Sequence, residues 1–241
     1  MLFHKFTSQR AQLGLTKAIA VKTPANPIES HQALRVELGG GVRDSEAIGY
    51  LGFRFAYHNL EDSNYGFLRG TQIEFFDILL SQQKDKTEIE KATLISIVSL
   101  AQRSAFFKSL SWRTKIGWDR DSLSEDAAFY GGVGAGFSWG NELAYIYFLV
   151  DPFFYIDVNS HIGVGGSVGF SIDKYKFMNT NFEATQRIYD SGEAQTLLKV
   201  SQGFRVSQNF QIMLKYDYID RLALEKKEPE NSLGVMLKYY Y

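Results

Sequence analysis

Few residues of this chain have the type and spacing that catalysis requires. Two serine and histidine combinations could serve in a lipid hydrolase, His58 with Ser63 and Ser160 with His161. A nucleophile and its base must meet within hydrogen-bond distance, and a third group must orient the base. Ser160 and His161 are neighbours that would point to opposite faces of a strand, whereas His58 and Ser63 suit an ordinary polar turn. We therefore expect no catalytic residue and no enzyme here, with a barrel lipid hydrolase as an alternative.

The sequence also contains few residues that could bind a metal or a cofactor. The sequence contains no cysteine, which excludes disulfides, thiolate metal sites and cysteine nucleophiles in this chain. His4, His31 and His161 are too dispersed in strand order to predict a metal site. The glycines between residues 163 and 169 alternate along an expected strand with no helix after them, so they form no phosphate cradle. We expect neither a metal nor a cofactor.

Composition excludes several further classes. Lys and Arg number 26 against 27 Asp and Glu, so no broad basic field is present to attract nucleic acid. Hydrophobic residues make up 45% of the chain, too many for a disordered protein. The longest apolar run, at residues 143–150, is far shorter than the roughly 18 residues of a membrane-spanning helix. The first residues lack the features of a secretory signal, so the chain either stays inside the cell or lacks its start.

Apolar residues recur with a period of two from residue 33 onward. Leu110, Trp112, Thr114, Ile116 and Trp118, for example, share one face of an expected strand. About twelve such segments lie near residues 33–41, 46–57, 69–82, 88–102, 109–119, 127–139, 142–150, 158–172, 174–186, 193–206, 209–220 and 231–241. Most are as long as the roughly 9 to 11 residues with which a tilted strand crosses a bilayer. The pattern predicts an all-β fold, an antiparallel transmembrane β-barrel of about twelve strands over residues 32–241, preceded by a linker or N-terminal extension at 1–31.

The last segment has the clearest alternation in the sequence. It consists of Leu233, Val235, Leu237, Tyr239 and Tyr241, each separated by one residue. It resembles the terminal strand by which bacterial outer-membrane barrels are recognised by the barrel assembly machinery. An edge strand of a soluble protein is the alternative, but such an apolar edge would promote aggregation. The pattern therefore favours outer-membrane lipid as the surroundings of the barrel.

Charged residues occupy the opposite face of many expected strands. If the apolar face contacts lipid, these side chains point into the lumen, because a lipid-facing Lys or Arg at the midplane costs about 2 to 4 kcal/mol. They are Arg35, Glu37, Arg54, Glu74, Arg113, Lys115, Lys199, Lys215, Asp217 and Lys238. Both signs are present, and mixed charges in a narrow lumen can pair with one another. We expect a largely filled lumen, with a passive pore as the alternative.

Two connections between expected strands are longer than the short turns that are typical of the periplasmic side of a barrel. In an even-stranded bacterial barrel both termini lie in the periplasm and periplasmic turns are short. The connections near 58–68 and 103–108 fall on that side and are long. We expect them to form a periplasmic rim that seats a partner, with self-packing against the barrel floor as the alternative. The residues of this rim are His58, Asp62, Tyr65, Arg103, Phe106 and Phe107.

The stretches 54–66, 69–80 and 94–118 resemble the C-terminal barrel of a bacterial family of unknown function. Fuller members of that family carry a Lnb-like periplasmic domain, related to papain-type cysteine hydrolases, before an outer-membrane barrel. His31 and the glycines at 39–41 fit the pattern, whereas Ser63 replaces its usual proline. The resemblance implies a barrel in the bacterial outer membrane that anchors and positions its own or a separate periplasmic domain. The family's hydrolase chemistry is not carried over, because this chain has no cysteine.

Overall fold

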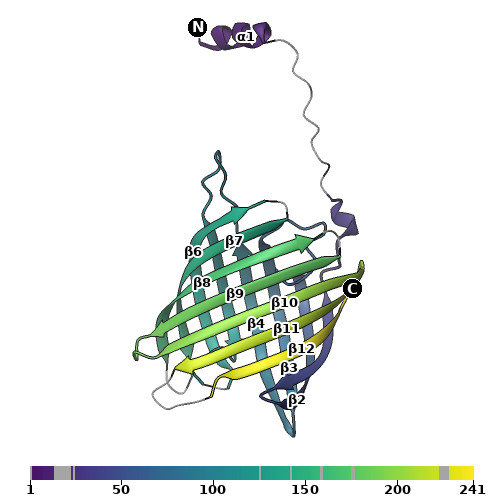
Figure 1. Ribbon diagram of the computed structural model, residues 1–241, viewed down its shortest axis with the longest axis vertical. Helices are drawn as coiled ribbons and strands as arrows, with labels where there is room; N and C mark the ends of the chain where they lie inside the picture. Colours follow the sequence, from purple (N-terminus) through teal and green to yellow (C-terminus); the bar gives the residue numbers. More distant parts are fainter. Residues whose placement is uncertain are drawn as a thin grey trace.

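The computed structural model describes residues 2–13, 23, 25–124, 126–141, 143–157, 160–174, 177–222 and 228–241. Its strands are β1 (Arg35–Arg43), β2 (Glu46–His58), β3 (Thr71–Gln83), β4 (Lys86–Ser99), β5 (Ser111–Asp119), β6 (Ala128–Gly140), β7 (Ala144–Ile156), β8 (His161–Lys174), β9 (Met178–Tyr189), β10 (Ala194–Ser207), β11 (Phe210–Leu222) and β12 (Glu230–Tyr240). A helix α1 (Leu2–Gln12) and one 3-10 turn η1 (Pro27–Glu29) precede them. The strands form one closed antiparallel barrel (Figure 1), which confirms the predicted fold class.

The barrel closes where the first strand pairs with the last. β1 and β12 are antiparallel and run from the pair Arg35 and Tyr240 to the pair Arg43 and Ser232. Because each of the described strands has two neighbours, none of them forms an unpaired sheet edge. Both ends of the barrel sequence lie at one end of this cylinder, which we call the termini end; the opposite end is the far end. The connections at 59–70 and 100–110 belong to the termini end, and the loop at 120–127 belongs to the far end.

Alternation along each strand gives the barrel an apolar outer surface. In β12, Leu233, Val235 and Leu237 are exposed on the outside, whereas Lys238 and Tyr240 are buried on the inside. Trp112, Trp139, Tyr57 and Tyr239 are exposed near the termini end, as expected for an aromatic girdle at a membrane interface. No helix among the described residues is long and apolar enough to cross a bilayer. A belt of apolar side chains on a closed barrel is the surface that lipid requires.

Strand boundaries differ from the expected ones mainly at β7. The sequence pattern ends this strand at residue 150, before Asp151 and Pro152, but the strand continues to Ile156. Proline lacks a backbone donor and is tolerated where the ladder is open. On the β6 side the paired residues pass from Gly132 and Phe153 to Ala135 and Val150, so the ladder is interrupted at Pro152. The register with β8 runs through Pro152 without a break.

The segment before β1 is partly attached to the barrel. Figure 1 shows α1 away from the barrel, and η1 beside its termini end. Gln208 donates to the backbone oxygens of Ile28 and Ser30, each at 2.9 Å, and Arg205 donates to the backbone oxygen of Glu29 at 2.7 Å. The predicted extension at 1–31 therefore ends in a short segment, residues 26–31, that is hydrogen-bonded to the barrel. We call it the approach segment.

Candidate functional site

The connection between β2 and β3 folds into the lumen instead of extending away from the barrel. We call residues 59–70 the plug. Its centre is Asp62, whose side chain is 0% exposed. One carboxylate oxygen accepts from Tyr240 at 2.8 Å, Lys238 at 3.1 Å and Arg35 at 3.4 Å, and the other accepts from Arg54. Four side chains from β1, β2 and β12 therefore converge on this carboxylate.

The charges around Asp62 keep it ionised. Burial by itself raises the pKa of a carboxyl group, because the charged form loses its hydration. Here the nearby charges of Arg54, Lys238 and Arg35 outweigh burial and hold the pKa of Asp62 well below its usual range. Breaking a buried ion pair by removing one partner is strongly destabilising. Asp62 is thus the residue that fixes the plug to the barrel wall.

Amide side chains of the wall bind the backbone of the plug. Asn179 donates to the backbone oxygen of Asp62 at 2.9 Å, and Asn181 donates to that of Leu60 at 3.1 Å. Gln211 donates to the backbone oxygen of Glu61 at 3.0 Å. Buried backbone carbonyls need such partners when no ladder supplies them. The sequence analysis did not single out these amides, although their inward position along β9 and β11 was a usable signal.

A chain of polar contacts links the approach segment to the rim of the termini end. His31 Nε2 lies 3.1 Å from His58 Nδ1, and His58 Nε2 lies 3.1 Å from Asn64 Oδ1. Asn64 donates to both oxygens of Asp173 at 3.0 Å, and Arg69 donates to the same carboxylate at 2.6 Å. His31 was grouped with His4 and His161, which are too dispersed in strand order to predict a metal site, but the fold brings it against His58.

A second loop folds into the lumen at the far end. Arg221 donates to the backbone oxygens of Ser122 at 2.9 Å and Arg120 at 2.8 Å, and Arg187 donates to that of Asp121 at 2.7 Å. The Asp121 carboxylate accepts from Lys199. Burial raises the pKa of Asp121, but neighbouring cations, with Lys199 first, outweigh it and lower that pKa overall. We call residues 120–122 the far-end loop.

A cavity of about 270 Å³ lies between the plug and the far-end loop. Both signs of charge line it: Arg113, for example, pairs with Asp151 and with Glu183, each at 2.7 Å. The ten charged residues assigned to the lumen are all engaged in ion pairs. In the part of the chain that the structure describes, the interior is thus a paired network around a small polar cavity.

The comparisons with known proteins agree with this architecture. A family model described as a domain of unknown function, DUF7840, matches residues 24–240. The chain belongs to the DUF7840 family. A search of curated proteins finds no match.

Solved structures that resemble the DUF7840 barrel are outer-membrane proteins. The NanC porin is 10% identical, with a TM-score of 0.55, and the match covers 86% of this chain and 100% of the porin. The KdgM porin is 8% identical, with a TM-score of 0.51 and coverage of 86% and 99%. An outer-membrane channel from Pseudomonas putida F1 is 10% identical, with a TM-score of 0.51 and coverage of 94% and 100%. At these identities the likeness shows the fold alone.

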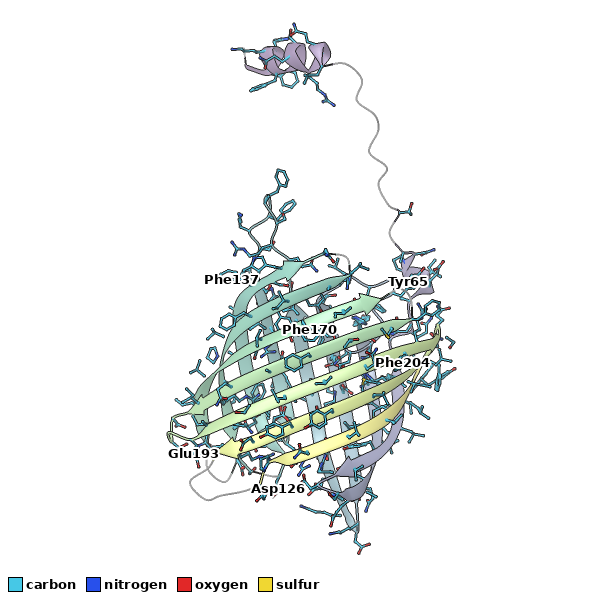
Figure 2. All side chains as sticks on the ribbon, viewed as in Figure 1. Tyr65, Asp126, Phe137, Phe170, Glu193 and Phe204 are labelled. Carbon is cyan, nitrogen blue, oxygen red and sulfur yellow. The ribbon has the colours of Figure 1, made fainter. Side chains whose placement is uncertain are left out.

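The six residues expected at the periplasmic rim do not form one surface in the DUF7840 barrel. His58 and Asp62 are buried in the lumen, which corrects the expectation that they are exposed to a partner. Tyr65 lies at the termini end (Figure 2). It is half-buried and donates to Glu29 at 2.6 Å. The physical reason is that the wall supplies three cations for the buried carboxylate of Asp62, so that its charge is compensated inside the lumen.

The other three rim residues belong to the connection between β4 and β5. Figure 1 shows this connection, in teal, standing above the termini end of the barrel. Arg103 lies over the ring of Phe137, 4.6 Å from its centre. Phe106 and Phe107 are 92% and 73% exposed, and their backbone N–H groups both donate to Ser104 Oγ. We call residues 103–108 the aromatic tip.

An open groove lies on the termini end of the DUF7840 barrel. Its volume is about 1540 Å³, and its lining includes Leu68, Leu143 and Phe177, all exposed. The plug supplies one wall, from Ser63 to Arg69, and the approach segment supplies another. The same loop that folds into the lumen therefore forms part of this outward-facing surface.

Neither serine and histidine combination has the geometry of a hydrolase. The two ring nitrogens of His58 contact His31 and Asn64, so the contacts of that ring do not include Ser63. The backbone N–H of Ser63 donates to Gln211 at 3.2 Å. Ser160 is exposed beside His161, whose Nδ1 lies 3.7 Å from Asp190. The described residues thus give no support to the hydrolase alternative.

Proposed function

We propose that this DUF7840 barrel anchors and positions a periplasmic domain or partner at the outer membrane. The closed twelve-stranded fold and its resemblance to outer-membrane porins and channels support this location. With an even number of strands, the termini end faces the periplasm. A Lnb-like domain, as the resemblance of the sequence implies, is the partner that we expect. The barrel would hold such a domain beside the membrane through the termini end.

The observation that carries this proposal is the exposed aromatic tip. Two adjacent phenylalanines, at 92% and 73% exposure, belong to the termini end, which also carries the groove. Contiguous exposed apolar surface is typical of sites that bind another molecule. A few residues contribute most of the binding energy at protein interfaces, and aromatic residues, including Phe, are enriched there. The tip and the groove together therefore offer a partner both an anchor and a cleft.

The test is the double substitution Phe106→Ser and Phe107→Ser. We expect it to abolish recovery of the Lnb-like domain, supplied in trans, with the detergent-solubilised barrel, while the barrel stays folded. Lys84→Ser in the exposed far-end turn is the matched control and should leave recovery unchanged. Full recovery with the double variant would contradict the anchoring proposal, and loss of the folded barrel would show that the tip packs against its own barrel floor.

A second candidate function is a passive pore, and two observations favour it. The structural neighbours are porins and channels, and a charged cavity occupies the middle of the lumen. One of them, KdgM, is a porin in complex with oligogalacturonate. A pore requires ion flow through the unmodified protein. Steady conductance of the wild-type barrel in a planar bilayer would favour this function over anchoring.

A further inference from the structure

Two buried imidazoles face each other beneath the approach segment. His31 Nε2 and His58 Nδ1 are 3.1 Å apart, and both residues are buried. The other nitrogen of each ring lies against an oxygen: His31 Nδ1 is 2.7 Å from the backbone oxygen of Gln32, and His58 Nε2 is 3.1 Å from Asn64 Oδ1. The amide of Asn64 cannot be reversed, because its Nδ2 donates to both oxygens of Asp173.

These outer contacts determine which nitrogen of each ring carries hydrogen. A backbone oxygen and an amide oxygen only accept, so His31 Nδ1 and His58 Nε2 must both donate. Each neutral imidazole has one N–H, which leaves a lone pair on His31 Nε2 and another on His58 Nδ1. Two lone pairs facing each other at 3.1 Å repel unless a cation lies between them.

We infer that His31 and His58, together with Asp62, bind a divalent transition-metal ion. Their potential ligand atoms all lie within 4.8 Å of one another, and all three residues are buried. Two imidazoles and one carboxylate form a ligand set that suits Zn²⁺, Co²⁺ or Fe²⁺. Metal-binding histidines usually donate their second N–H to a carbonyl or carboxylate, as both rings do here. The outer contacts thus hold both rings in the tautomer that a metal requires.

Asp62 supplies the negative charge of this cluster. Ion pairs connect it to a network in which Arg35, Arg54, Lys91 and Lys238 are the cations. The carboxylates of the network are Glu37, Glu61, Asp62, Glu74 and Asp77. Asp62 Oδ2, 4.0 Å from His31 Nε2, also accepts from Arg54 and Asn59, so Asp62 is the weakest of the three ligands.

The metal would connect three separate parts of the chain. His31 belongs to the approach segment, His58 ends β2, and Asp62 is the centre of the plug. A ligand that binds only the folded arrangement stabilises it. The ion would therefore hold the plug closed and fix the point where the N-terminal extension meets the barrel. This inference does not depend on the anchoring function.

The experiment measures metal bound to the whole folded barrel in detergent after chelation and addition of Zn²⁺ alone. We expect about one Zn²⁺ per chain and a higher unfolding temperature. The substitutions His31→Gln and His58→Gln should each lower the affinity at least tenfold, and Asn64→Ala should lower it about 10- to 100-fold through the His58 tautomer. His161→Gln, outside the cluster, is the control and should bind like the wild type.

A second measurement on the wild-type protein covers the case in which a variant fails to fold. X-ray absorption of the Zn²⁺-loaded barrel should show imidazole nitrogens at about 2.0 Å from the metal. Absence of bound Zn²⁺ and of any thermal shift would overturn the inference. So would ¹⁵N spectra at neutral pH that show a third N–H on the two rings, because a shared proton would then occupy the space.

Discussion

Asp62 shows how one side chain can determine the conformation of a loop. The carboxylate has no exposed surface, and cations from β1, β2 and β12 surround it. An uncompensated buried charge is costly. The buried position of Asp62 therefore depends on the wall cations, and the buried wall cations depend on Asp62. The hydroxyl of Tyr240, in the terminal strand, adds a neutral donor at 2.8 Å. The last strand, β12, therefore helps to hold the plug in place.

The substitution Asp62→Asn tests this dependence. It leaves Arg54, Arg35 and Lys238 without their shared partner, so we expect a loss of about 3 to 5 kcal/mol in the free energy of unfolding at pH 7. Urea unfolding in lipid vesicles measures it. Asp126→Asn is the control, because the Asp126 side chain is 84% exposed and an exposed pair contributes little. An equal, small effect of both substitutions would refute the role of Asp62.

The same substitution has a defined pH dependence. The pKa of Asp62 is lowered in the folded protein from the unfolded value of 3.8. The stability that this group contributes is therefore complete above the unfolded pKa and is lost as the pH falls towards the folded pKa. We expect the difference between Asp62→Asn and the wild type to be constant from pH 5 to 7 and to shrink below about pH 4. A difference that grows on acidification would contradict this assignment.

Two elements fold into the lumen, and they are held there by different means. The plug is held by the carboxylate of Asp62 and by wall amides that bind its backbone. The far-end loop is held by Arg221 and Arg187, which donate to its backbone oxygens. Each arrangement satisfies buried carbonyls that lie outside the strand ladders. Opening the lumen requires both sets of contacts to break.

Conductance in planar bilayers tests this closure. The wild-type barrel should show little or no conductance, because both ends are filled. Replacing residues 60–68 with an Asn-Gly turn should raise the conductance, and adding Arg221→Ala should raise it further by loosening the far-end loop. A wild-type barrel that conducts as well as the double variant would show that neither loop closes the lumen and would favour the pore.

At the scale of the whole molecule, closure of the sheet determines stability. Every strand pairs on both sides, including β1 with β12, and no backbone row is left unpaired at an edge. In lipid an unsatisfied backbone group costs several kcal/mol, so such a barrel opens cooperatively or not at all. The paired charges of the interior add contacts between strands that are distant in sequence.

Electrophoresis with and without boiling measures the stability of the closed barrel. The folded barrel should keep its compact shape in detergent at room temperature and migrate differently after boiling. Removing residues 233–241, which deletes the closing partner of β1, should abolish the difference in mobility. A wild-type chain that migrates identically in both conditions, and stays soluble and monomeric without detergent, would contradict the membrane barrel.

The sequence was sufficient to predict the barrel because its signal is local. A period of two over about nine or more residues specifies a strand with one apolar face, and it does so independently of the rest of the chain. The alternation of Leu233, Val235, Leu237 and Tyr239 could be read directly and corresponds to an outward face in the structure. The main boundary error, at Pro152, arose because the open ladder position that tolerates proline depends on the neighbouring strand.

The tertiary structure alone decided which loops fold inward and which groups meet there. The plug was expected at an exposed rim, but Asp62 finds its cations on strands that are adjacent only because the barrel closes. His31 and His58 are 27 residues apart, and no spacing rule joins them. Interactions between distant segments depend on the register and closure of the sheet, whereas alternation depends only on neighbouring residues. The physical reason is therefore the range of the interaction: the local signal determined the strands, and the long-range pairing of buried charges determined the interior.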